Sequence, residues 1–272
     1  MKFMKLFKNH SKLNVIGMVH LDALPGTPKY SGNFEKIVSK AVEEAKIYES
    51  HNLDGILIEN MHDVPYVQDK SLGPEIVSSM TRIASEIKKV LQPNTPCGIQ
   101  VLACGNRQAL AIAKACDLQF IRAEGFVFGH VADEGYTDAC AGELLRYRKQ
   151  IDAEDVLVFT DLKKKHSSHS ITADTSLLET AHAAEFFLTD GIVLTGTATG
   201  HAADTKDLED LNGKVKVPLL IGSGVTKDNI SQYSKAEALI IGSYFKEKGN
   251  WENKLSDKRI SELMNKVNEL RK

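Results

Sequence analysis

Acidic and basic side chains stand at the ends of short apolar runs in this sequence, where they could move protons on a bound ligand. His20 and Glu59 end the first two runs, and Asp161 lies near the end of the fifth. Imidazoles and carboxylates act as general acids and bases when their pKa values lie near the working pH. Each residue taken alone is equally explained by a salt bridge or a loop cap, so the prediction rests on the cluster. The predicted catalytic residues are Asp161, Glu59, His20, Lys163, His166, Arg122 and Glu124.

Three consecutive lysines follow Asp161 after one intervening leucine, and they allow two interpretations. If the strand persists, Asp161, Lys163 and Lys165 share one side, because strand side chains alternate with a period of two. A lysine at a strand end can form a Schiff base when its pKa is depressed. The alternative is a solvated charge run that attracts an anionic ligand, and this is the interpretation we adopt for Lys164.

Glycine-rich turns follow the last two apolar runs, and together they predict a phosphate site. A phosphate needs several N–H donors directed at one point, and glycine lets the main chain approach it closely. In barrels this site is frequently built from the loops after the seventh and eighth strands. The alternative is that the glycines only turn the chain. The predicted phosphate ligands are Gly222, Ser223, Gly224, Gly242 and Ser243.

Further polar residues in the same loops are candidates for substrate contacts. These are Asp22, Asn60, Asp63, His130, Thr195 and Gly196. A divalent metal held by His20, Glu59, Asp161 or His166 is an alternative, but the sequence contains neither His-x-His after the first run nor HExxH. We therefore predict no metal site and no specific cofactor.

The elements that would hold these residues follow a regular order of strand and helix. Eight apolar runs are each followed by a stretch that reads as helix, and the links leaving the runs are often long and polar, whereas the returning links are short. A closed ring of parallel strands with outer helices produces this asymmetry, because its outgoing loops gather at one rim. The predicted fold class is α/β, a (β/α)8 TIM barrel with an extra C-terminal amphipathic helix. The runs are Leu13–His20, Asp54–Glu59, Cys97–Leu102, Leu118–Ala123, Val156–Leu162, Gly191–Leu194, Val217–Ile221 and Ala238–Ile241.

A chain of 272 residues fits one barrel of about 250 residues better than two small domains. We expect a single barrel domain over residues 13–272, with a last helix near Asp257–Glu269 that packs on the barrel wall. Residues 1–12 are expected to form an N-terminal extension with a ragged end. The long loop from Glu124 to about Ala141 is typical of a lid or binding loop.

Composition narrows the functional classes. A net charge of −2 with interspersed signs gives no footprint for nucleic acid. No apolar run approaches the roughly 20 residues of a membrane span. Four cysteines without a CxxC pair favour reduced thiols and a cytoplasmic protein. The alternative is a mitochondrial or other organellar protein, because residues 1–12 carry lysines and no acid.

Several motifs resemble the BtpA/SgcQ family over nearly everything after Lys12. They include Gly17–Gly26, Asp54-Gly55 with Glu59-Asn60 and Asp63–Pro65, Gly129–Gly135, Leu144–Arg148, Asp161–Lys163 with Lys165–Ser167, Thr195–Gly200, Gly222–Val225 and Ile241–Lys246. The resemblance implies a ribulose-phosphate-binding type of TIM barrel, without a settled reaction. The sequence departs from the family pattern at Ala103–Asn106 and at Lys164.

Three functions remain open at this stage. The first is an enzyme that binds a small phosphorylated sugar or nucleotide-like metabolite and uses acid/base chemistry, as an isomerase, lyase or glycosidic hydrolase. The second is a non-catalytic assembly or biogenesis factor, because one member of the resembled family is linked to biogenesis of photosystem I. The third is a metal-dependent hydrolase. A homo-oligomer is compatible with each of them.

Overall fold

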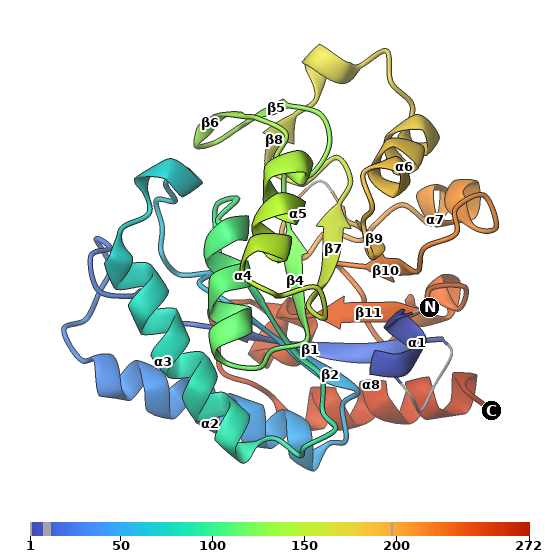
Figure 1. The fold of residues 1–272 in the computed structure, drawn as a ribbon. Coiled ribbons are helices and arrows are strands. Elements are labelled where there is room, and N and C mark those ends of the chain that lie inside the picture. Colours follow the sequence, from blue (N-terminus) through green and yellow to red (C-terminus); the bar gives the residue numbers. More distant parts are fainter. Residues whose placement is uncertain (1, 8–11, 197) are drawn as a thin grey trace.

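A computed structural model describes residues 2–7, 12–196 and 198–272 of the chain. Eight parallel strands form a closed barrel in the order β1-β11-β10-β9-β7-β4-β3-β2 (Figure 1). The predicted (β/α)8 barrel is confirmed, and every predicted apolar run contains a barrel strand. The strands are β1 (Asn14–His20), β2 (Gly55–Glu59), β3 (Cys97–Gln100), β4 (Phe120–Ala123), β7 (Leu157–Asp161), β9 (Gly191–Leu194), β10 (Leu219–Ile221) and β11 (Ala238–Ile241).

Helices cover the outside of the barrel. The α-helices after α1 are α2 (Phe34–Ser50), α3 (Pro74–Val90), α4 (Asn106–Ala115), α5 (Ala141–Gln150), α6 (Leu177–Phe186), α7 (Thr205–Leu211) and α8 (Asp257–Leu270). Local sequence sets several of their starts: the Asn33 side chain accepts a hydrogen bond from Lys36 N, and Ser176 forms a capping box with Glu179. The stretch between β10 and β11 holds only a 3₁₀ turn, η3 (Ile230–Tyr233), where the sequence predicted a helix.

The inside of the barrel is filled by large side chains that need small neighbours. Phe120 and Phe159 lie with ring centroids 5.3 Å apart and are fully buried. A Cβ on Gly98 would lie 2.3 Å from Phe120, and a Cβ on Gly191 would lie 2.8 Å from Phe159. Glycine at these strand positions therefore leaves the volume that the two rings occupy.

The N-terminal helix α1 (Lys2–Leu6) closes the amino-terminal end of the barrel. Phe3 lies 5.9 Å from the Phe159 ring and Phe7 lies 6.3 Å from the Phe120 ring, and both are 2% exposed. The sequence predicted an N-terminal extension without regular structure, but residues 2–7 are ordered against the barrel, because the rings of Phe3 and Phe7 are buried among apolar side chains of the strands. Residues 1 and 8–11, and Thr197 of the Thr195–Gly200 motif, lie outside the described residues.

A small second sheet stands above the carboxyl-terminal rim. The long loop after β4 folds into a hairpin of β5 (His130–Ala132) and β6 (Gly135–Thr137), and β5 also pairs with β8 (Ser167–Ser168). In Figure 1 these three strands lie together at the top of the molecule, beyond the end of α5. The sheet joins the loop that follows β4 to the loop that follows β7.

The short 3₁₀ turns also stand mostly in connecting loops. They are η1 (Asp69–Ser71), η2 (Ser170–Thr172), η4 (Ser243–Phe245) and η5 (Glu247–Gly249).

Candidate active site

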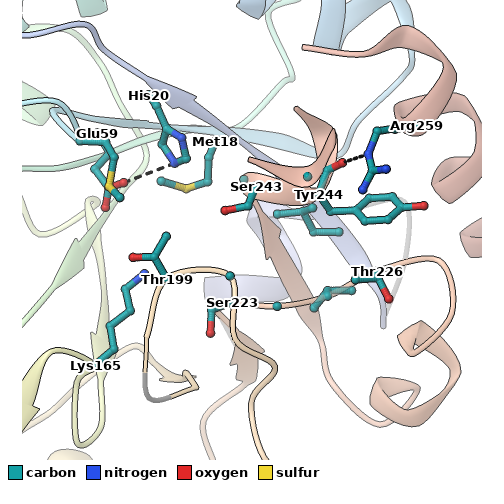
Figure 2. Close-up of a pocket in the computed structure, with 18 of the residues that line it drawn as sticks. Met18, His20, Glu59, Lys165, Thr199, Ser223, Thr226, Ser243, Tyr244 and Arg259 are labelled. Carbon is teal, nitrogen blue, oxygen red and sulfur yellow. Dashed lines mark hydrogen bonds and ion pairs between the residues drawn. The ribbon is translucent and has the colours of Figure 1, made fainter. Parts of the chain in front are cut away.

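A cavity of about 110 Å³ opens at the carboxyl ends of the strands, several times the roughly 10–15 Å³ that one water molecule needs. His20 and Glu59 line it on one side (Figure 2), and Arg122 is a further lining residue. The glycine turns after β10 and β11 line it on the other side. The structure therefore brings part of the predicted catalytic set and the whole predicted phosphate set to one place.

Glu59 and His20 form a buried acid–imidazole pair. They are paired residues at the ends of neighbouring strands β2 and β1, and His20 Nε2 lies 3.5 Å from Glu59 Oε2. Burial raises the pKa of Glu59, and Lys165 and Arg122 only partly offset this effect. Burial, with a smaller contribution from Lys246, lowers the pKa of His20. The pair thus favours a carboxyl that keeps its proton to higher pH beside a neutral imidazole.

Arg122 and Asp161 form a second buried pair. Arg122 Nε and Nη2 donate to the two carboxylate oxygens of Asp161 at 2.9 and 2.8 Å. Burial acts to lower the pKa of Arg122, but the Asp161 carboxylate outweighs burial and raises that pKa. A Cβ on Gly222 would lie 3.0 Å from Arg122 Nη2, so glycine there leaves room for the guanidinium. Both carboxylate oxygens of Asp161, which was predicted as an acid/base group, are hydrogen-bonded to Arg122.

The lysine run does not continue the strand. β7 ends at Asp161, and Lys163 adopts a φ of +46°, which turns its Nζ away to donate to Thr175 O at 2.7 Å. Lys165, and not Lys163, lines the cavity and points toward Glu59 (Figure 2). The strand ends at Asp161, four residues before Lys165, so the condition under which Asp161, Lys163 and Lys165 would share one strand face is not met.

Lys164 is buried, although the sequence interpretation made it part of a solvated charge run. It is 7% exposed, and its Nζ lies 3.5 Å from Glu124 Oε2 and 3.9 Å from Glu134 Oε2. Burial opposes ionisation of Glu124, but Lys164 and Arg122 outweigh it and lower the pKa of Glu124. Glu124 lines a neighbouring rim cavity with Cys104, beside the site that holds His20 and Glu59.

Several predicted substrate contacts hold loops together. Asn60 Nδ2 donates to Asp63 at 2.8 Å and Asn60 Oδ1 accepts from Leu102 N at 2.7 Å. Asp63 also accepts a hydrogen bond from Leu24 N at 2.8 Å. These bonds tie the loops after β1, β2 and β3. Asp22 is likewise engaged, because its carboxylate pairs with Lys40.

Four other predicted residues surround the cavity without lining it. His166 is exposed, and its ring nitrogen lies 3.1 Å from the hydroxyl of Thr199, which itself lines the cavity. His130 is buried in the rim sheet, with its ring 5.3 Å from that of His169. Gly196 N donates to Ser223 Oγ at 2.8 Å, and the hydroxyl of Thr195 is buried without a hydrogen bond among the described residues.

The glycine turns form the other wall of the cavity. Gly224 has a φ of +67°, and a Cβ there would lie 2.2 Å from Ala202 N, so only glycine fits. A Cβ on Gly242 would lie 2.8 Å from His20 Cε1, so this glycine also makes room for the His20 imidazole. Ser223 Oγ donates to His201 O at 2.9 Å, so this hydroxyl links the turn after β10 to the loop after β9.

Arg259 of α8 lines the same wall, and sequence reasoning missed it. Its Nε donates to Tyr244 O at 2.6 Å and its guanidinium lies 4.2 Å above the Tyr244 ring (Figure 2). The terminal nitrogens of the guanidinium carry further N–H donors. The amphipathic pattern predicted the helix that carries Arg259, but no local signal marked its direction toward the rim.

Within the described ranges, no group of three or more His, Cys, Asp or Glu side chains has the arrangement of a metal site. Among the same residues, no helix is both long enough and apolar enough to cross a membrane.

The fold that carries this cavity is a (β/α)8 TIM barrel with paired glycine turns after β10 and β11. The chain belongs to the BtpA family, whose model matches residues 11–269. A Caenorhabditis elegans protein whose name marks it as mitochondrial is 46% identical over 267 residues, 97% of this chain and 96% of the relative. The photosystem I biogenesis protein BtpA of Synechocystis sp. is 34% identical over 268 residues, 96% of this chain and 89% of that protein.

Solved structures share the fold at low sequence identity. Phosphoribosyl anthranilate isomerase from Thermus thermophilus matches with a TM-score of 0.59 and 14% identity, over 95% of this chain and 100% of that one. Orotidine 5'-monophosphate decarboxylase from Methanocaldococcus jannaschii matches with a TM-score of 0.57 and 14% identity, with the same coverage. At this level of identity the likeness concerns the fold alone.

Proposed function

We propose that this protein is an enzyme that binds a small phosphorylated sugar or nucleotide-like metabolite in the cavity at the barrel rim. The observation that carries the proposal is one cavity with two chemically different walls. The Glu59–His20 pair stands with Arg122 and Lys165 on one wall, and glycine turns stand with Arg259 on the other. Fixed groups on rigid strand ends are what catalysis requires.

The glycine wall suits the phosphate. Gly222, Gly224 and Gly242 line this wall and have no side chain that would block an anion, and Arg259 adds a charged donor. Two barrels of the same fold are named for reactions on phosphoribosyl anthranilate and orotidine 5'-monophosphate, which are both phosphorylated.

The opposite wall suits proton transfer. Glu59 can give or take a proton, and His20, 3.5 Å away, can receive it. Arg122, held by Asp161, and Lys165 would stabilise negative charge that develops on a ligand oxygen. Isomerase, lyase and glycosidic hydrolase reactions all use these elements, and the proposal covers all three.

Ligand-dependent thermal stabilisation tests the phosphate part. We expect phosphorylated aldoses, ketoses or nucleotides to raise the melting temperature, because their phosphate binds at the glycine turns and Arg259. Their dephosphorylated counterparts should leave the melting temperature unchanged. Arg259→Gln should weaken binding about 10- to 100-fold, the value of roughly 1.5–3 kcal/mol for a charged hydrogen bond. Arg82→Gln, on the outer helix α3, is the matched control. Binding that is unaffected by Arg259→Gln and by removal of phosphate would overturn the proposed wall.

A measurement of substrate turnover distinguishes an enzyme from an assembly factor. The second role is suggested by the name of the Synechocystis relative. Glu59→Gln should abolish turnover of a bound ligand while ligand affinity persists, because the amide keeps the shape but moves no proton. If cells that carry Glu59→Gln retain full function, the assembly role replaces the catalytic one.

We also propose that the protein works in an aqueous compartment, either the cytoplasm or, as the name of the C. elegans relative suggests, the mitochondrion. Fractionation of cells that express the untagged chain distinguishes the two.

A further inference from the structure

We infer that Lys165 forms a Schiff base with the carbonyl carbon of an open-chain phosphorylated aldose or ketose. The inference rests on the proposed function and narrows its substrate class to carbonyl compounds. It is carried by the position of one amine that faces the cavity and has no partner in the part of the chain that the structure describes.

The lysines near the rim differ in the hydrogen-bond and ion-pair partners of their Nζ atoms. Lys163 donates to Thr175 O, Lys164 is paired with Glu124, and Lys246 Nζ lies 2.7 Å from Glu44 Oε1. Among residues 2–7, 12–196 and 198–272, Lys165 Nζ has no hydrogen-bond or ion-pair partner. Its side chain lines the cavity and points across it toward Glu59 (Figure 2). Lys165 is therefore the rim lysine whose amine is free to meet a ligand.

The surroundings of Lys165 favour a reactive amine. A lysine is nucleophilic only when its amine is neutral, which desolvation and nearby cations promote. The loop that carries Lys165 places it among groups of both signs: Arg122 and His20 face it, and so do Glu59, Asp161 and Glu124. Burial first, and Arg122 second, lower the pKa of Lys165, although the three carboxyl groups act in the opposite direction.

The neighbouring pair can carry the protons that imine formation requires. Neutral Nζ attacks the carbonyl carbon and forms a C–N bond, while the carbonyl oxygen takes a proton from Glu59. The nitrogen then loses a proton to His20, which leaves a neutral carbinolamine.

His20 returns its proton to Glu59 across the 3.5 Å that separates them. Glu59 then protonates the hydroxyl, the C–O bond breaks, water leaves and the nitrogen lone pair completes the C=N bond. The amine, the carbonyl and the Glu59 proton are converted to a protonated imine and water, and nothing is oxidised or reduced.

The same cavity explains why the carbonyl compound would be phosphorylated. Lys165 and Thr199 line the cavity opposite Ser243 and Arg259 (Figure 2). A ligand anchored by its phosphate at the glycine turns would extend its other end toward Lys165. A short chain of carbons between phosphate and carbonyl fits this arrangement.

Borohydride trapping tests the inference on the full-length protein. The protein is incubated with glyceraldehyde 3-phosphate, dihydroxyacetone phosphate or ribose 5-phosphate, and borohydride reduces any imine to a stable secondary amine. We expect one adduct, which peptide mass mapping locates at Lys165, and we expect glyceraldehyde and ribose to give only background labelling. An adduct at another lysine, or equal labelling by the unphosphorylated sugars, would overturn the inference.

Two variants make the result specific. Lys165→Arg keeps a positive charge but has no nucleophilic amine, so its adduct should be lost while binding of the phosphorylated sugar persists. Lys163→Gln is the matched neighbour and should keep the Lys165 adduct. If the wild-type protein binds the sugars without forming an adduct, the Schiff base is wrong and the proposed function stands. If none of the sugars binds, the proposed function fails for this class of ligand.

Discussion

At the scale of single residues, the site contains charged side chains that are buried and that pair with side chains of opposite charge. Arg122 and Asp161 are about 3% and 6% exposed, and each of them satisfies the other through two hydrogen bonds. A buried pair adds little net stability, but removal of one partner leaves a charge that nothing solvates. The pair therefore makes the geometry of the cavity sensitive to single substitutions.

We predict that Asp161→Asn lowers the free energy of unfolding by about 3–5 kcal/mol, because Arg122 then stays buried without a counter-ion. Urea denaturation at neutral pH measures the effect. Glu154→Gln is the control, because the Lys149–Glu154 pair is exposed and such pairs contribute less than about 1 kcal/mol. Equal effects of the two substitutions would contradict the structural role of Asp161.

His130 predicts how stability depends on pH. Burial first, with Lys164 second, lowers the pKa of His130 to about 4. The unfolded chain takes up a proton below about pH 6.5, whereas the folded protein resists this until about pH 4, so stability is lost as the pH falls through this window. As the pH falls, the free energy of unfolding of His130→Gln should therefore decrease by up to about 3 kcal/mol less than that of the wild type. Melting temperatures from pH 7 to pH 4.5 measure it, and identical slopes for variant and wild type would refute the prediction.

At the scale of elements, strand ends and small residues set the site. Register places His20 beside Glu59, and glycines after β10 and β11 leave space for Arg122 and His20. Glycine in these turns is therefore explained by the neighbouring side chains, and the proposed function adds a second reason, the close approach of an anion. Substitution of Gly224 strains the backbone and meets Ala202, so loss of binding in such a variant would not by itself identify a phosphate contact.

The helix α1 supplies the prediction at this scale. Phe3→Ala combined with Phe7→Ala should lower the free energy of unfolding by at least about 3 kcal/mol, because two aromatic rings leave the barrel interior. Met4→Ala, at a position 39% exposed on the same helix, is the control. Chemical denaturation of the full-length variants provides the measurement, and a double variant as stable as Met4→Ala would show that α1 contributes nothing to the core.

At the scale of the whole molecule, the two ends of the chain meet at the amino-terminal side of the barrel. β1 pairs with both β2 and β11, which closes the ring. Arg271, just after α8, donates to Leu13 O at 2.8 Å and also binds Asp54. The last helix therefore fastens the first strand to the second from outside.

We predict that Arg271→Ala destabilises the whole barrel by about 3 kcal/mol, because Asp54 keeps a largely buried charge without its arginine. Urea denaturation should show one cooperative transition whose midpoint moves to a lower urea concentration, since β1 and β11 cannot separate without opening the ring. Loss of α8 alone, seen as a separate early transition, would contradict this coupling.

The order of strands, the gathering of loops at one rim and the two glycine turns followed from the sequence alone. They are local or periodic features: apolar runs, short returning links and glycines directly after strands. Glu59, His20 and Arg122 could be placed at the rim for the same reason, because each ends or nearly ends a strand.

Which of these groups line the cavity was decided only by the tertiary structure. Lys163 and Lys165 differ by two positions, yet Lys163 donates to Thr175 O whereas Lys165 lines the cavity. Arg259 comes from a helix near the end of the chain, and Phe3 from its beginning. Contacts between residues so far apart in sequence depend on how the barrel closes, and neither periodicity nor local propensity contains that information.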